Sequence, residues 1–122
     1  MSKILVIEDD SVLQQAYKDK FERNGFQVIC AVSGEEGIQT AAKEIPDLII
    51  LDIILVGNLT GEDVLKQIKL NPKISSIPVV IMTNLDDKMF KFYDMGANWY
   101  FVKATTTLEQ VLNKIKEILN HN

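Results

Sequence analysis

Two apolar runs in this sequence end in carboxylates. The run ILVI is followed by Glu8, Asp9 and Asp10, and the run LIIL is followed by Asp52. Carboxylates that lie close together repel each other unless a cation neutralises them. Hard oxygen ligands favour Mg²⁺, which keeps several waters and often bridges to phosphate. We therefore expect Glu8, Asp9 and Asp52 to hold Mg²⁺, and Asp10 to be a loop residue that precedes a helix.

Two further polar side chains could complete a site for phosphoryl transfer. Thr83 ends the run IPVVIM, and Lys103 ends the run WYFV. An Asp carboxylate can act as the nucleophile toward a phosphoryl group and form an aspartyl phosphate. The reaction depends on positioning and on neutralising the phosphoryl oxygens, tasks that suit Mg²⁺, the Lys103 ammonium and the Thr83 hydroxyl. Asp52 is the expected nucleophile.

The elements that must position these residues alternate between strands and helices. Five apolar, β-branched runs predict strands at 3–8, 26–31, 47–52, 77–83 and 99–103, with helical patterns between them. Capping pairs predict the helix starts, and these pairs are Ser11 with Gln14, Ser33 with Glu36, Thr60 with Asp63, Asn84 with Asp87, and Thr106 with Glu109. Gly25 and Gly96 are expected to end the first and fourth helices.

This alternation is typical of an α/β protein with a parallel sheet and helices on both faces. We expect a single-domain (βα)5 flavodoxin-like fold over residues 1–122, with five parallel strands in the order 2-1-3-4-5. In that order the carboxyl ends of strands 1, 3, 4 and 5 lie at one edge of the sheet, where such folds carry their functional sites. The predicted site residues would therefore converge from four separate places in the chain.

Composition excludes several other classes of protein. The net charge of −4 argues against a general nucleic-acid or membrane-surface binder. No apolar run approaches the roughly 18 residues of a membrane span, and the acidic start MSKILVIEDD does not fit a secretory signal. Cys30 is the single cysteine, which favours a cytoplasmic location. One cysteine and one histidine, His121, are too few for the usual zinc cluster.

The full set of site residues resembles the receiver domain of two-component response regulators. The acidic pair Glu8-Asp9, then Asp52, Thr83 and Lys103, each follow the expected strand, and the resemblance covers the whole chain. It implies that Asp52 receives a phosphoryl group from a phosphohistidine on a sensor histidine kinase or phosphotransfer protein. It also implies a signalling switch that gains and loses its own phosphoryl group, and not a turnover enzyme.

The resemblance assigns roles to further residues. The backbone carbonyl of Ile54 would join the Mg²⁺ ligands. Thr83 would move toward the phosphoryl oxygens, and Tyr100 would turn inward with it. Asn84 follows Thr83 where the family usually has a small residue, so we expect its larger side chain to contact the phosphoryl group and to narrow access to it.

The sequence expected to form the fourth helix, LDDKMFKFYDMG, is unusually apolar. One face is expected in the core and carries Leu85, Met89 and Phe92. Phe90 and Tyr93 then point elsewhere, either partly buried against a neighbouring helix or exposed as a contact patch beside Tyr100. The resemblance implies that the face formed by helix 4, strand 5 and helix 5 contacts a downstream protein or a second copy of the chain.

Several residues depart from the pattern of that family. Ala104 follows Lys103 where the family usually has a proline after a cis bond, so we expect a trans bond and a rearranged turn. The loop IILVGNLTG after Asp52 is one residue longer than usual. Ile54 and Leu85 are apolar and offer nothing to orient an attacking water. We therefore expect a phosphorylated state that lasts minutes to hours, and not seconds.

Two other functions compete with this interpretation. One is a receiver-like scaffold that binds its partners without phosphorylation, although all the key side chains are present. The other is a small Mg²⁺-dependent phosphohydrolase, for which we identify no general acid placed for turnover. The chain ends soon after the fifth predicted helix, so any output is expected to pass through another protein.

Overall fold

The computed structural model describes residues 1–85 and 87–120, so His121 lies outside the described residues. The strands are β1 (Lys3–Ile7), β2 (Gln27–Ala31), β3 (Leu48–Asp52), β4 (Val79–Thr83) and β5 (Trp99–Val102). The helices are α1 (Ser11–Glu22), α2 (Gly34–Glu44), α3 (Gly61–Leu70), α4 (Met89–Asp94) and α5 (Leu108–Ile118), and a short 3-10 turn, η1, spans Lys103–Thr105. No helix in these described ranges is both long enough and apolar enough to cross a bilayer.

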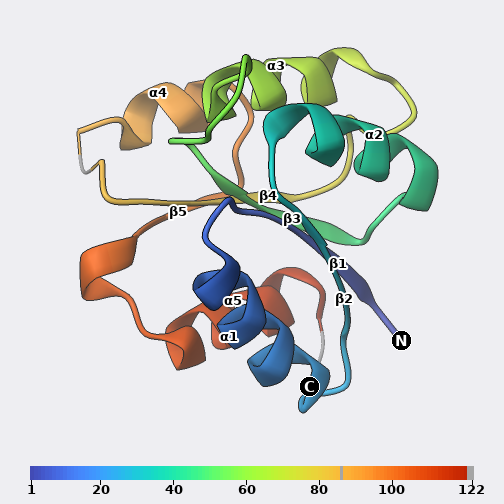
Figure 1. The fold of residues 1–122 in the computed structure, drawn as a ribbon, viewed down its shortest axis with the longest axis vertical. Coiled ribbons are helices and arrows are strands. Elements are labelled where there is room, and N and C mark those ends of the chain that lie inside the picture. The colour runs from blue at the N-terminus through green and yellow to red at the C-terminus, as the bar shows by residue number, and fades with distance from the viewer. Residues whose placement is uncertain (86, 121–122) are drawn as a thin grey trace.

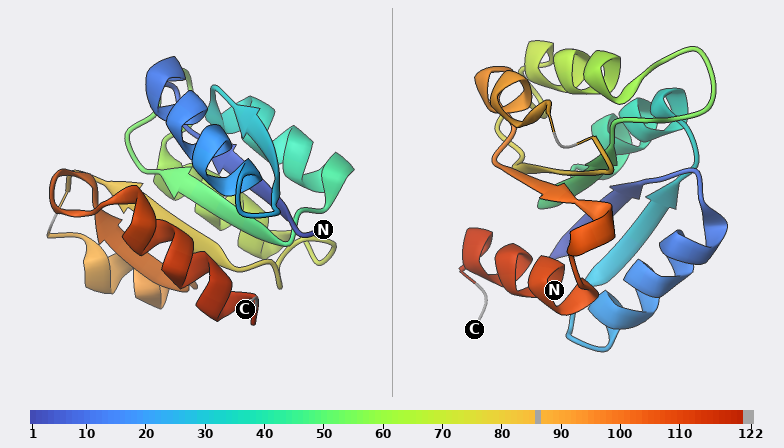
Figure 2. Two further views of the ribbon diagram at one scale, coloured as in Figure 1. Left: turned by 90° about the horizontal axis from the view of Figure 1, so that it is seen from below. Right: turned by 90° about the vertical axis from the view of Figure 1, so that its left-hand side faces the viewer.

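The five strands form one parallel sheet in the order β2-β1-β3-β4-β5, which confirms the predicted topology. Helices α1 and α5 cover one face of the sheet, and α2, α3 and α4 cover the other (Figures 1 and 2). Because both faces are covered, the inner strands need apolar side chains at almost every position. This explains the continuous runs ILVI, LIIL and VVIM in the sequence.

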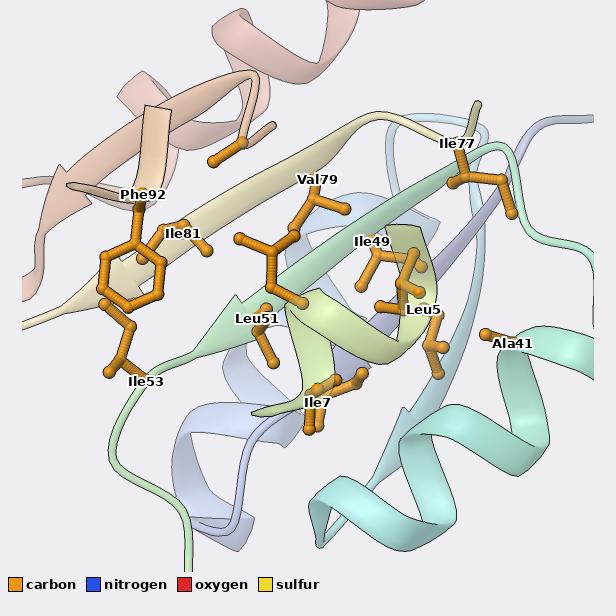
Figure 3. Close-up of a cluster of buried hydrophobic side chains, with 14 of the residues drawn as sticks. Leu5, Ile7, Ala41, Ile49, Leu51, Ile53, Ile77, Val79, Ile81 and Phe92 are labelled. Atoms are coloured by element: carbon orange, nitrogen blue, oxygen red, sulfur yellow. The ribbon is translucent and has the colours of Figure 1, made fainter. Parts of the chain in front are cut away.

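Side chains of each strand alternate between two buried clusters. Leu5 and Ile49 point to the cluster under α2, α3 and α4, whereas Ile4 and Ile50 point to the cluster under α1 and α5. Figure 3 shows the first cluster, in which residues from neighbouring strands pack side by side, with Phe92 at one side next to Ile81 and Ile53. The two clusters fix the sheet, and the sheet fixes the strand ends that carry the predicted site.

The predicted starts of α2 and α3 are confirmed. The Ser33 hydroxyl accepts the backbone N–H of Glu36, and Thr60 forms a reciprocal capping box with Asp63. Gly61 follows this cap at a close approach to β3, where a Cβ atom would lie 2.3 Å from the Cα of Ile53. Glycine is therefore required at the first position of α3.

The predicted starts of α1 and α5 are wrong by one residue. Asp10, not Ser11, caps α1, because its Oδ1 accepts the N–H groups of Val12 and Leu13 at 2.9 and 3.2 Å. The cap of α5 is Thr107, paired with Gln110, and not Thr106. In both places two adjacent side chains are able to cap, so the sequence alone does not select between them. Gly25 and Gly96 have positive φ angles just beyond α1 and α4, as predicted.

Helix α4 differs most from its prediction. It begins at Met89 with no side-chain cap, and Asn84, the predicted cap, lies outside the helix and accepts the N–H of Ala104 instead. Phe92 is buried and Leu85 packs against the core, but Met89 is 37% exposed and does not belong to the buried face. Met89 is the first residue of this short helix and faces solvent, and Phe92 is the helix residue that enters the core. Of the two predicted surface aromatics, Phe90 is 81% exposed and Tyr93 is half-buried against the core.

Candidate functional site

Three carboxylates meet at the carboxyl ends of β1 and β3. The two strands pair with Ile7 opposite Leu51, so the residues that follow, Glu8 and Asp52, are neighbours. Both are buried, whereas Asp9 is half-buried. Oxygen atoms of Glu8, Asp9 and Asp52 all lie within 4.8 Å of one another. The predicted convergence of these acids is therefore present.

Lys103 follows β5, which is separated from β3 by β4, and its side chain extends to the acidic cluster. Its Nζ lies 2.5 Å from Glu8 Oε1 and 2.9 Å from Asp52 Oδ2. These ion pairs join residues 95 and 51 positions apart in the sequence. The long side chain crosses over β4 because the strand order places β4 between Lys103 and the acids.

The charges of the cluster are not balanced by one lysine. Burial raises the pKa of Glu8 to about 7, and the negative charge of Asp52 adds to this rise, while the hydrogen bond from Lys103 opposes it. Burial alone would lower the pKa of Lys103, but its hydrogen bonds to Glu8 and Asp52 raise it overall. When all groups are ionised, three carboxylates face one ammonium, which leaves a surplus of two negative charges.

That surplus and the all-oxygen donor set fit a hard divalent cation such as Mg²⁺. The three acids line an open cleft of about 290 Å³, together with Asp10, Ile54, Thr83, Asn84 and Lys103. The backbone N–H of Ile54 donates to Asp52 Oδ1 at 3.1 Å, which holds the start of the loop beside the carboxylates. The predicted use of the Ile54 carbonyl as a ligand stays a prediction.

Thr83 and Tyr100 are linked through the loop that follows β4. Thr83 is fully buried at the edge of the cleft, and its hydroxyl accepts the N–H of Leu85 at 3.4 Å. The Tyr100 hydroxyl donates to the carbonyl of the same Leu85. The Tyr100 ring is buried and lies 6.2 Å, centroid to centroid, from that of Phe92. Tyr100 is thus already turned inward in this structure.

Asn84 lines the cleft, but its side chain is engaged with another loop. Its Oδ1 accepts the backbone N–H of Ala104 at 2.9 Å. No peptide bond in the described ranges is cis, so the Lys103–Ala104 bond is trans as predicted, and the chain continues into η1. Direct contact between Asn84 and a phosphoryl group stays a prediction.

Gln14 supports the site in a way that the sequence analysis missed. Its side-chain amide donates to the backbone carbonyl of Glu8 and, at 3.3 Å, to that of Ala31. These bonds tie α1 to the carboxyl ends of β1 and β2. The spacing of Gln14 suggested a capping partner for Ser11, and no local signal in the sequence points to Glu8 or Ala31 instead.

Comparisons with known proteins agree with this geometry. The family model described as "Response regulator receiver domain" matches residues 4–116. The protein PilH of Pseudomonas aeruginosa is 31% identical over 121 residues, which cover 98% of each chain. The transcriptional regulatory protein PhoP of Bacillus subtilis is 34% identical over 122 residues, but the matched region covers only 49% of PhoP. The chain therefore spans nearly all of one relative and about half of the other.

Solved structures with the same fold include receiver proteins. A two-component response regulator from Clostridium difficile has a TM-score of 0.89 at 30% identity, over 98% of this chain and 97% of that chain. The N-terminal domain of a response regulator receiver protein from Methanoculleus marisnigri has a TM-score of 0.77 at 30% identity, over 100% of this chain and 99% of that chain. With the family model spanning most of the sequence, this chain belongs to the response regulator receiver domain family.

Proposed function

We propose that this receiver domain is a phosphoacceptor switch of a two-component phosphorelay and that Asp52 accepts the phosphoryl group. The observation that carries the proposal is the contact of the Lys103 ammonium with both Asp52 and Glu8 inside an acidic cleft. A buried nucleophile held between a cation and further carboxylates matches the requirements of phosphoryl transfer, which are positioning and charge neutralisation.

The reaction is a transfer from nitrogen to oxygen. An oxygen of the Asp52 carboxylate attacks the phosphorus of a phosphohistidine on a histidine kinase or phosphotransfer protein. The O–P bond of an acyl phosphate forms, the N–P bond breaks, and its electron pair stays with the imidazole. Lys103 keeps Asp52 in place before transfer and neutralises phosphoryl charge afterwards. When bound, Mg²⁺ supplies further neutralisation, and the residues that would hold it are Glu8, Asp9, Asp52 and the Ile54 carbonyl.

The proposed signal passes through the loop after β4. Thr83 hydrogen-bonds a phosphoryl oxygen and thereby changes the position of Leu85. The Leu85 backbone N–H donates to the Thr83 hydroxyl, and the Leu85 carbonyl accepts from the Tyr100 hydroxyl. A shift of this loop changes the position of the Tyr100 ring, which is bonded to it, and the position of α4, which follows it in the chain. The exposed Phe90, with Tyr93 beside it, then alters the surface offered to a downstream protein or a second copy.

Receiver domains are signalling domains, and we propose that this one does not turn over a substrate. Its phosphoryl group would persist for minutes to hours, because the apolar Ile54 and Leu85 offer no group to orient water. The proposed location is the cytoplasm, where a histidine kinase could reach Asp52. Neither nucleic acid nor a membrane is a proposed direct partner.

Incubation with phosphoramidate and Mg²⁺, followed by intact-protein mass spectrometry, tests the proposal. The expected result is a gain of one phosphoryl group that is absent in Asp52→Asn. An unlabelled wild-type protein would favour the scaffold function, especially if Mg²⁺ with beryllofluoride failed to shift amide signals near Asp52 and Tyr100. Continuous release of inorganic phosphate from a simple ester would favour the phosphohydrolase.

A further inference from the structure

At each end of the β4–β5 strand pair, an asparagine side chain accepts a hydrogen bond from the backbone of the other segment. At the amino end, Asn98 Oδ1 accepts the backbone N–H of Val79 at 3.0 Å. At the carboxyl end, Asn84 Oδ1 accepts the backbone N–H of Ala104 at 2.9 Å. The backbone ladder itself ends where Thr83 pairs with Val102. The Asn84 side chain therefore extends the pairing of the two segments beyond the sheet.

The bond to Asn84 anchors the turn that carries Lys103. The backbone of η1 makes a 3.4 Å bond from Thr106 N–H to the Lys103 carbonyl, and the Thr105 and Thr106 hydroxyls bond to the Val102 carbonyl. These bonds stay within residues 102–106. In contrast, the backbone N–H of Ala104 donates to Asn84, which lies in the loop after β4 and so joins the turn to a distant segment of the chain.

The position of the turn decides where the Lys103 ammonium lies. Its side chain has four rotatable carbon–carbon bonds and must reach over β4 to contact both Glu8 and Asp52. A turn that moved away from β4 would draw the ammonium away from one or both carboxylates. Orientation of this kind contributes strongly to reaction rates, because small displacements of a reacting or stabilising group reduce catalysis.

We propose that Asn84 is a positioning residue, which sets the Lys103 ammonium through the N–H of Ala104, and that direct contact with the phosphoryl group is not its main role. The inference rests on the proposed function. It assigns to Asn84 a task at the site that depends on its side-chain oxygen. It also makes the loops after β4 and β5 one connected unit, since Asn84 lies between Thr83 and Leu85 in the chain.

A double-mutant cycle with Lys103 tests the inference. Asn84→Ala should slow phosphorylation by phosphoramidate about two- to tenfold, the effect of one lost hydrogen bond of ordinary strength. In a Lys103→Met background, Asn84→Ala should cause no further loss, because the group that it positions is gone. A full additional loss in that background would overturn the proposal, since Asn84 would then act independently of Lys103.

Amide hydrogen exchange measured by NMR supplies a readout that needs no phosphodonor. Ala104 should exchange slowly in the wild type, faster in Asn84→Ala, and slowly again in Asn84→Asp, which keeps the acceptor oxygen. The side-chain carbon signals of Lys103 should also move toward those of an exposed lysine in Asn84→Ala. Unchanged Ala104 exchange or unchanged Lys103 signals in Asn84→Ala would overturn the proposal.

Asn98→Ala is the matched control, because it removes the same kind of bond from the other end of the same strand pair. It should speed exchange at Val79 while Ala104 exchange and the phosphorylation rate stay as in the wild type. A rate loss equal to that of Asn84→Ala would show that general loosening of β4–β5 explains both, which would also overturn the inference. Failure of the proposed function looks different, because the wild type itself would take up no phosphoryl group.

Discussion

At the amino ends of the strands, Asp47 and Asn98 bond to the backbone of a neighbouring strand, whereas at the carboxyl ends Glu8 and Asp52 also form ion pairs with the Lys103 side chain. We refer to Asp47 and Asn98 as the amino edge. There, Asp47 Oδ2 accepts the Lys3 backbone N–H at 2.7 Å, and Asn98 accepts the N–H of Val79. Each of these side chains satisfies one donor of a neighbouring strand.

The carboxyl edge, which consists of Glu8, Asp9, Asp52 and Lys103, has a different balance. Glu8 and Asp52 both contact the Lys103 ammonium, Asp9 lies beside them, and the three carboxylates together carry an excess of negative charge when ionised. At the amino edge, Asp47 and Asn98 each accept a hydrogen bond from the backbone of the protein. At the carboxyl edge, one ammonium does not neutralise the charge of the three carboxylates. The difference supports the cation site that we propose at the carboxyl edge, whereas the bonds of the amino edge contribute to stability.

The largest expected effect comes from Lys103→Met. This variant removes the ammonium that contacts Asp52 and keeps much of the side-chain volume. Loss of one preorganised charge-stabilising group typically lowers a rate by about a hundredfold to a thousandfold, and we expect a loss of that size for phosphorylation by phosphoramidate. A rate within a factor of about two of wild type, too small for the loss of such a group, would refute the role given to the carboxyl edge.

Asp9→Asn should weaken Mg²⁺ binding, because a neutral amide replaces one proposed carboxylate ligand. Changes close to a bound metal typically cost about ten- to a hundredfold in affinity, and we expect at least the lower end of that range. Titration with Mg²⁺ followed by amide shifts measures this constant. The matched control is Asp10→Asn, which keeps the oxygen that caps α1 and should change the affinity far less. Equal losses in the two variants would argue against a specific ligand role for Asp9.

Ile54→Asn should shorten the lifetime of the phosphorylated protein. Ile54 lines the cleft and is 58% exposed, so an amide at this position could orient a water molecule toward the acyl phosphate. Decay of the phosphorylated mass after removal of the phosphodonor gives the rate. Val56→Asn, at another exposed position of the same loop, should leave the lifetime unchanged. The same lifetime in wild type and Ile54→Asn would remove the basis for the slow hydrolysis that we predict.

Asp47→Ala should have the smallest effect on function. It removes the acceptor of the Lys3 N–H at the amino edge, and one such hydrogen bond contributes about 1 kcal/mol to the free energy of unfolding. Urea denaturation should register this loss, while the phosphorylation rate at 25 °C should match that of wild type. A clear loss of phosphorylation in a folded Asp47→Ala protein would end the functional distinction between the two edges.

The sequence predicted the sheet order and the meeting of the site residues, because both follow from where apolar runs stop. It did not predict which neighbour caps a helix, as Asp10 and Thr107 show, since adjacent residues had nearly equal ability to cap. The exposure of Met89 was not predicted, because the apolar stretch 85–96 does not indicate where a helix of only six residues begins and ends.

Bonds between distant segments were the other omission. The bond of Gln14 to Glu8 and that of Asn84 to Ala104 join loops that only the finished fold brings together. No periodicity or spacing within one segment contains this information. Lys103 was predicted correctly to lie near the acids because its contact depends on strand order, which the apolar runs do reveal.

A crystal structure of the wild-type protein grown in excess Mg²⁺ tests the central claim most directly. We predict an ion held by oxygens of Glu8, Asp9, Asp52 and the Ile54 carbonyl, with Mg²⁺–oxygen distances of about 2.0–2.1 Å, and with Lys103 still at Asp52. A structure in which the three carboxylates have moved apart and no ion lies between them would contradict the account.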